Sequence, residues 1–156
     1  MSSPAYETQA ERDAAAAEFG AELARIAAEK GLPLPVPSEL AWFRAEFEGE
    51  HKHPVGSGRP GESVPDRAVL YRKQDGTTPY LYLSRGWVTL ALGRTPDLAE
   101  ALRAAVRWLA GARLPEIRRT APFLHVEDWA LAHERVPLTA AELEWRTRLQ
   151  HFDHGC

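Results

Sequence analysis

The strongest constraint on the fold of this chain comes from short runs in which apolar and polar side chains alternate. The runs are 40–47 (LAWFRAEF), 68–73 (AVLYRK), 79–84 (PYLYLS) and 86–93 (GWVTLALG). A period of two is typical of β-strands, and Asp75-Gly76 between two of the runs is a strong hairpin signal. Hairpin connections exclude a parallel sheet built from βαβ units. We therefore expect a meander of about four antiparallel strands.

Helical patterns flank this meander on both sides. Phe19, Leu23 and Ile26 recur on one face of a helix that begins near Glu11, and Gly31 is a natural stop. Further helices are expected from an N-cap at Thr95, after Pro115, over 126–135 and from Thr139 to Phe152. The expected fold class is α+β: an N-terminal helix, then the meander, then three to four C-terminal helices packed on one sheet face.

The length of 156 residues suits one domain with one hydrophobic core. We expect residues 1–10 to be a flexible tail, 11–152 to form a single α+β domain and 153–156 to form a C-terminal tail. Residues 48–67 are rich in Gly and Pro, which predicts a long loop there, either an ordered lid or a disordered segment.

The number of cysteines and the hydropathy of the chain indicate in which cellular compartment the protein works. The only cysteine is Cys156, so neither an internal disulfide nor a zinc site made of several cysteines can form. The N-terminus shows no secretory pattern, and no apolar run reaches the length of a membrane span. We therefore expect a cytoplasmic protein with no membrane partner.

The charge pattern argues against nucleic acid as a partner. The net charge is −3, although five arginines and a single acid, Glu116, lie between Arg103 and Arg119. Nucleic-acid binding needs a basic domain or a longer basic stripe. A solvated helix face explains the arginines better.

The second half of the chain resembles a known family. The segment reads GRTPDLAEALRAAVRWLAGARLPEIRRTAPFLHVEDWALAHER and is followed by Trp145. Its rhythm of Gly-x-Thr-x-Asp-Leu, Trp-Leu-x-Gly, Pro-Phe and Ala-x-x-His-Glu resembles an uncharacterised actinobacterial family, domain of unknown function 6193. The match covers roughly residues 80–150. Members are described as natural-product biosynthesis proteins, so the resemblance implies a biosynthetic gene cluster and assigns no catalytic residue.

Residues 121–135 (APFLHVEDWALAHER) gather two histidines and three acids beside Trp129. In a helix, His133 shares a side with Trp129, as a core or boundary histidine would. Alternatively, His133 is a catalytic general base that Glu127 or Glu134 orients. A zinc signature HExxH would need a second histidine at position 137, which is proline, so no metal is expected here.

Two other segments look like motifs but lack the context that their chemistry needs. GSGRPGES (56–63) matches the dinucleotide-binding glycine pattern, yet Pro65 prevents the helix that must follow. HFDHGC (151–156) carries metal-ligand types at a chain end, where a site would be poorly preorganised. We expect neither a cofactor nor a functional metal ion.

Strand alternation gives the strongest candidate site. Leu81, Leu83, Val88, Leu90 and Leu92 are expected on one sheet face, with Tyr80, Tyr82, Trp87 and Thr89 on the other. Trp42 and Tyr71 join the second set, and arginines at its rim (Arg44 and Arg72, or Arg118 and Arg119) could hold an acid. Either this aromatic face is open and marks an interface, or late helices with Trp145 cover it.

These observations suggest an accessory or binding protein in bacterial natural-product biosynthesis. Its aromatic face would bind a peptide, a biosynthetic enzyme or a small-molecule intermediate, with homodimerisation through the face as a further option. The alternative is a cofactor-independent enzyme of the cyclase or isomerase type, using His133 and Glu127. An immunity or self-protection protein is a third option.

Overall fold

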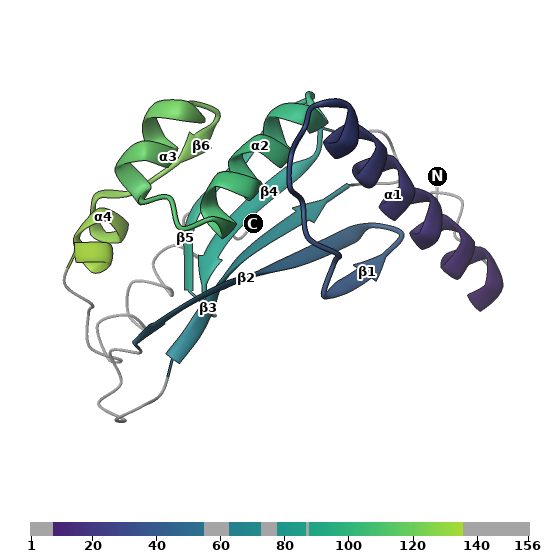
Figure 1. The fold of residues 1–156 in the computed structure, drawn as a ribbon, viewed down its shortest axis with the longest axis horizontal. Coiled ribbons are helices and arrows are strands. Elements are labelled where there is room, and N and C mark those ends of the chain that lie inside the picture. Colours follow the sequence, from purple (N-terminus) through teal and green to yellow (C-terminus); the bar gives the residue numbers. More distant parts are fainter. Residues whose placement is uncertain (1–7, 55–62, 73–77, 87, 136–156) are drawn as a thin grey trace, which may run out of the picture.

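The computed structural model describes residues 8–54, 63–72, 78–86 and 88–135. It confirms the α+β class, with an N-terminal helix, an antiparallel sheet and further helices after the sheet. Helices α1 (Gln9–Glu29), α2 (Leu98–Leu109) and α3 (Leu114–Thr120) lie on the same side of the sheet (Figure 1). Helix α4 (Asp128–Arg135) follows α3. The helix expected from Thr139 to Phe152 lies outside the described residues.

The sheet is a continuous meander in the order β1-β2-β3-β4-β5-β6, and all neighbours are antiparallel. The strands are β1 (Glu39–Ala41), β2 (Arg44–Pro54), β3 (Ser63–Tyr71), β4 (Tyr80–Arg85), β5 (Val88–Arg94) and β6 (Leu124–His125). The expectation of about four strands was therefore too low. One expected strand is a hairpin of two, and β6 carries only two residues, too few to show an alternating pattern.

The expected single strand over 40–47 is divided by a turn at Trp42 and Phe43. Ala41 pairs with Arg44, so these two aromatic residues form the end of the β1–β2 hairpin. Two-residue hairpin turns usually need Gly, Asn or Asp in a left-handed conformation. Among the described residues, positive φ angles occur only at glycines, so this turn carries none of the expected signals.

The expected long loop over 48–67 was too long. Strand β2 runs to Pro54 and β3 begins at Ser63, so residues 48–54 and 63–67 belong to strands. The register shifts between Glu48 and Lys52, and Lys52 then pairs with Pro65. An irregular ladder tolerates a residue without an N–H donor, which explains why prolines do not end these strands. The glycine-rich motif of residues 56–63 lies almost wholly outside the described residues.

Two helix starts differ from the sequence expectation. Thr8 caps α1 by accepting the backbone N–H of Glu11, so residues 8–10 belong to the helix start and not to a tail. Asp97, rather than Thr95, caps α2, and its carboxylate accepts the N–H groups of Ala99 and Glu100. A carboxylate also complements the positive end of the helix dipole, which favours aspartate as the cap.

The hydrophobic core lies between the helices and one face of the sheet. Its largest fully buried side chains come from α1, α2, α3 and four strands: Trp108, Phe19, Phe47, Leu23, Leu70, Leu81, Leu83, Leu90, Leu102, Leu114 and Ile117. Trp108 also donates its indole N–H to the Ser84 carbonyl oxygen at 3.0 Å, which ties α2 to β4. Burial of this one face supplies most of the driving force for the fold.

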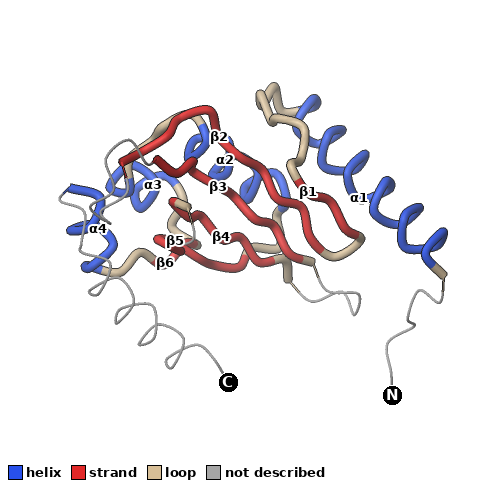
Figure 2. Tube along the Cα trace, turned by 90° about the horizontal axis from the view of Figure 1, so that it is seen from below, coloured by secondary structure: helices blue, strands red, loops and turns tan. Residues whose placement is uncertain are grey.

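Every second side chain of each strand points to the opposite face of the sheet. Seen from below in Figure 2, the strands run in front of α2. A bulge in the β4–β5 ladder changes one expected assignment, because Leu83 pairs with Ala91 and Tyr82 with Leu92. Ala91 therefore takes the buried face, and Leu92 lies beside Tyr82 on the other, contrary to the simple alternation.

Gly93 provides a test of how β6 docks on β5. A methyl group at position 93 would overlap the Phe123 carbonyl oxygen, a backbone atom that cannot turn aside. We expect Gly93→Ala to lower the free energy of unfolding by about 1–3 kcal/mol, measured by urea denaturation.

Gly20→Ala is the matched control. A methyl group there would meet only the end of the Leu40 side chain, at 2.7 Å, and that side chain can move. Alanine is also the better helix former. A loss of stability in Gly20→Ala as large as that in Gly93→Ala would contradict this account.

Candidate functional site

The sheet register defines a face that we call the tyrosine face. Paired residues in neighbouring strands point to the same side. The face therefore comprises Arg44, Glu46, Glu48, Arg67, Val69, Tyr71, Tyr80, Tyr82, Ser84, Thr89, Leu92 and Arg94, with His125 at its edge. These residues come from β2 to β6, and the tyrosines lie on the two central strands β3 and β4.

Three tyrosines form a connected aromatic cluster in the middle of this face. The rings of Tyr80 and Tyr82 are stacked, with centroids 5.4 Å apart and an angle of 18° between their planes. Tyr71 meets Tyr82 edge to face, at 5.4 Å and 82°. All three side chains are partly exposed. Burial and the neighbouring tyrosines raise the pKa of Tyr82, so its hydroxyl stays a hydrogen-bond donor.

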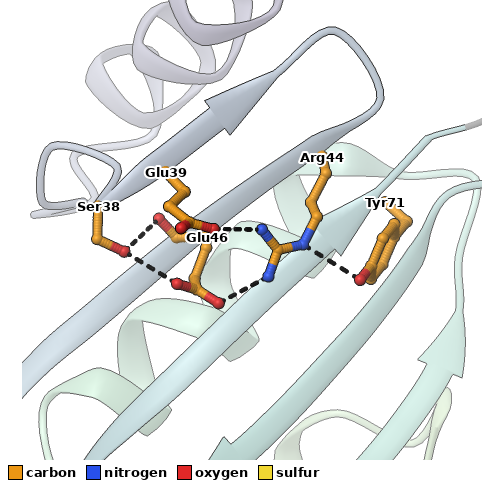
Figure 3. A network of polar contacts seen from close by, with 5 residues as sticks. All are labelled: Ser38, Glu39, Arg44, Glu46 and Tyr71. Carbon is orange, nitrogen blue, oxygen red and sulfur yellow. Dashed lines mark hydrogen bonds and ion pairs between the residues drawn. The ribbon is translucent and has the colours of Figure 1, made fainter.

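Arg44 fixes one end of the cluster (Figure 3). Its Nε donates to the Tyr71 hydroxyl at 3.1 Å. Its two terminal nitrogens pair with Glu39 at 2.7 Å and with Glu46 at 2.8 Å. The hydrogen bond to Glu39 is the main reason why the pKa of Arg44 is raised. Every nitrogen of this guanidinium is engaged, so Arg44 positions Tyr71 rather than offering a free charge.

A second arginine lies at the opposite edge of the cluster. The Arg94 guanidinium carbon is 4.4 Å from the centroid of the Tyr80 ring, which is a cation–π contact. Arg94 is exposed and pairs with Tyr80 across the β4–β5 ladder. The face thus presents aromatic rings between two arginines with different roles.

The structure brings together only part of the expected set. Tyr71, Tyr80 and Tyr82 gather as expected, whereas Trp87 lies outside the described residues. Trp42 lies in the hairpin turn against Phe43, at 5.1 Å between ring centroids. It is therefore not part of a strand of the tyrosine face.

The other expected arginines lie on the helix side of the sheet. Arg118 and Arg119 are exposed in the last turn of α3, away from the tyrosine face (Figure 1). Arg72 packs over the Phe19 ring of α1 at 4.1 Å and donates to the Trp42 carbonyl oxygen. The sequence does not show on which side of the sheet α1 and α3 pack, and this packing takes the three arginines away from the rim.

Sequence reasoning missed Arg67, Val69, Leu92 and Arg94 as members of the face. Val69 lies in the expected strand 68–73, and the alternation from Tyr71 would have found it. Arg67 fell within the expected loop 48–67, so the alternation was not extended to it. Leu92 could not be found, because a bulge reverses the pattern.

A buried ion cluster lies on the helix side of the sheet. Arg85 donates its Nε to Asp66 at 3.0 Å, and its terminal nitrogen lies 3.7 Å from Glu134. Both acids are almost fully buried, and the Arg85 guanidinium lies over the Trp108 ring at 5.3 Å. The cluster joins β3, β4 and α4.

Glu134 also stabilises the start of α3. Its two carboxylate oxygens accept the backbone N–H of Leu114 at 2.9 and 3.0 Å, while Arg113, the N-cap residue itself, provides no side-chain hydrogen bond. A carboxylate from α4 thus supplies the missing cap. This role explains Glu134 without catalysis.

His133 and Glu127, the expected catalytic pair, lie in different settings. His133 is 7% exposed, and burial together with the charge of Arg85 lowers its pKa, so the imidazole is neutral near pH 7. Glu127 accepts the indole N–H of Trp129 at 2.6 Å and lies 3.6 Å from His125. These contacts make both residues part of the packing around α4.

Glu134→Ala tests the buried cluster. The substitution leaves Arg85 with one carboxylate fewer and the start of α3 uncapped. We expect the free energy of unfolding to fall by about 3 kcal/mol, measured by chemical denaturation. Glu134→Gln, whose amide oxygen still accepts from Leu114, should lose less. Glu116→Ala, at an exposed site in the first turn of α3, is the control and should change stability by less than about 0.5 kcal/mol.

His133 predicts a pH dependence of stability. Because its pKa is below 6.5 in the folded chain, the unfolded chain binds the proton more readily at mildly acid pH. The free energy of unfolding should therefore be highest above pH 6.5 and fall as the pH drops toward the folded-state pKa. His133→Gln should remove most of this fall below pH 6.5. An unchanged slope in the variant would show that other groups cause it.

Neither a membrane span nor a metal cluster is found in the described part of the chain. No helix there is long and apolar enough to cross a membrane. No three His, Cys, Asp or Glu side chains gather there in a way that could hold a metal ion. Comparisons of the chain with family models, with curated proteins and with solved structures found no match.

Proposed function

We propose that this chain is a binding protein whose tyrosine face holds a small molecule with a planar apolar group. The observation that carries the proposal is the contact cluster of Tyr71, Tyr80 and Tyr82 on the sheet face opposite α2. Partly exposed aromatic rings with polar tips are typical of recognition surfaces.

The cluster is held in place before any ligand arrives. Tyr71 is fixed by Arg44, which is itself held by Glu39 and Glu46, and Tyr80 is covered on one side by Arg94. Rings on adjacent central strands have little freedom to lose on binding. Preorganisation of this kind lowers the entropic cost of association.

Binding fits the geometry better than catalysis by His133. A general base must come within hydrogen-bond distance of its substrate. His133 is 7% exposed, and Glu127 is engaged by Trp129. The enzyme alternative would need α4 to move before a substrate could reach the imidazole.

The biological setting is part of the proposal and rests on the sequence. The resemblance of residues 80–150 to an actinobacterial natural-product family suggests a pathway intermediate as the ligand. The same considerations favour a bacterial cytoplasm. A self-protection protein would use the tyrosine face in the same way, with the pathway product as its ligand.

Naphthalene carboxamide, a neutral planar probe, tests the proposal by isothermal titration calorimetry. We expect Tyr82→Leu to weaken binding roughly tenfold, because leucine keeps the apolar bulk and loses the stacking surface. Phe43→Leu is the control, since Phe43 is an exposed ring in the β1–β2 turn, and should leave the affinity unchanged.

Two outcomes would overturn the proposal. In the first, sedimentation shows a dimer that Tyr82→Leu dissociates, which means that a second copy occupies the face. Alternatively, the wild type binds no probe and Tyr82→Leu is destabilised by as much as a core substitution, about 2–5 kcal/mol. The tyrosines would then be core residues.

A further inference from the structure

Arg67 is the feature of the tyrosine face that the contacts among the described residues do not explain. Its Nε is buried and has no hydrogen-bond partner, the one such side-chain atom among the described residues. Arg67 pairs with Glu48 of β2 and with Ser84 of β4. It therefore lies one row of side chains beyond Val69 and Tyr82, on the same face.

An unpaired buried donor is costly. Loss of water without a compensating acceptor costs about 1–3 kcal/mol, and more when the donor belongs to a charged group. No carboxylate in the described part of the chain forms an ion pair with Arg67, although Glu48 is opposite in the register and exposed. Arg44 and Arg85, by contrast, use their Nε atoms in hydrogen bonds to Tyr71 and Asp66.

The charges on the face are divided between its two halves. The acids Glu39, Glu46 and Glu48 lie on β1 and β2. Arg44 neutralises Glu39 and Glu46, and Glu48 is exposed opposite Arg67. On β3, β4 and β5, the described positions of this face carry Arg67 and Arg94 and no acid. A ligand lying over the tyrosines thus meets positive charge at both ends and no carboxylate between them.

We propose that Arg67 binds a carboxylate of the ligand whose planar group rests on the tyrosine cluster. A carboxylate approaching side-on accepts from Nε and one terminal nitrogen of a guanidinium together. Because the Nε is buried in the unliganded protein, the Arg67 side chain turns toward the ligand on binding, which gives the Nε its acceptor and neutralises the charge. This inference rests on the proposed function, and it defines the ligand class as aromatic or polyene carboxylic acids.

A matched pair of probes isolates the carboxylate. Naphthalene carboxylate and naphthalene carboxamide share the ring and differ only in the charged group. We expect wild-type protein to bind the carboxylate roughly tenfold more tightly than the amide, as a charge-assisted hydrogen bond would give. Arg67→Gln should abolish this preference and leave the affinity for the amide unchanged.

Three variants complete the experiment. Arg94→Gln removes the other arginine of the face and should retain most of the preference for the carboxylate. Arg67→Lys keeps the charge without the planar fork and should give an intermediate preference. It also replaces Arg67→Gln if that variant does not fold. Tyr82→Leu should weaken both probes equally, because it removes the stacking surface alone.

The possible failures are distinguishable. Equal affinity of wild type for both probes, or a preference that follows Arg94 and not Arg67, overturns the role of Arg67 and leaves the binding face intact. Absence of binding for both probes overturns the binding face and, with it, this inference. A preference for the carboxylate that is as large in both Arg67→Gln and Arg67→Lys as in the wild type also rejects the role of Arg67 in binding the carboxylate.

Discussion

The structure depends on a single constraint, the two-sidedness of a continuous antiparallel meander. Side chains alternate along each strand, and the register carries that alternation from one strand to the next. Once Leu70, Leu81 and Leu83 are buried under α1 and α2, the register fixes the opposite face as well. Tyr71, Tyr80 and Tyr82 are neighbours because of this register, not because of any local motif.

The charged groups on the two faces are arranged in different ways. On the helix side, Arg85 is enclosed by Asp66 and Glu134, and the same Glu134 caps α3. A buried ion pair of this kind holds parts of the chain in one arrangement more than it adds stability. On the tyrosine face, Arg44 is fully paired whereas the Nε of Arg67 is not. This contrast suggests that the helix-side charges serve the fold and that Arg67 serves a ligand.

The features that the sequence predicted are those that depend on local patterns. The stripe of Phe19 and Leu23 located α1, and the alternation around Tyr80 and Tyr82 located β4 and the face of its side chains. The features that it missed depend on distant partners. Leu92 changed faces at a bulge that only the pairing with β4 reveals. The cap of α3 comes from Glu134, twenty residues away from Leu114, and no local signal marks it.

The central claim is that the tyrosine face binds a planar ligand, and the ring signals of the tyrosines test it most directly. The chain has four tyrosines, so selective ¹³C labelling of their rings gives a spectrum of four signals during titration with naphthalene carboxylate. We predict saturable shifts of the signals from Tyr71, Tyr80 and Tyr82. Unchanged signals from those three tyrosines at saturating probe would contradict the account.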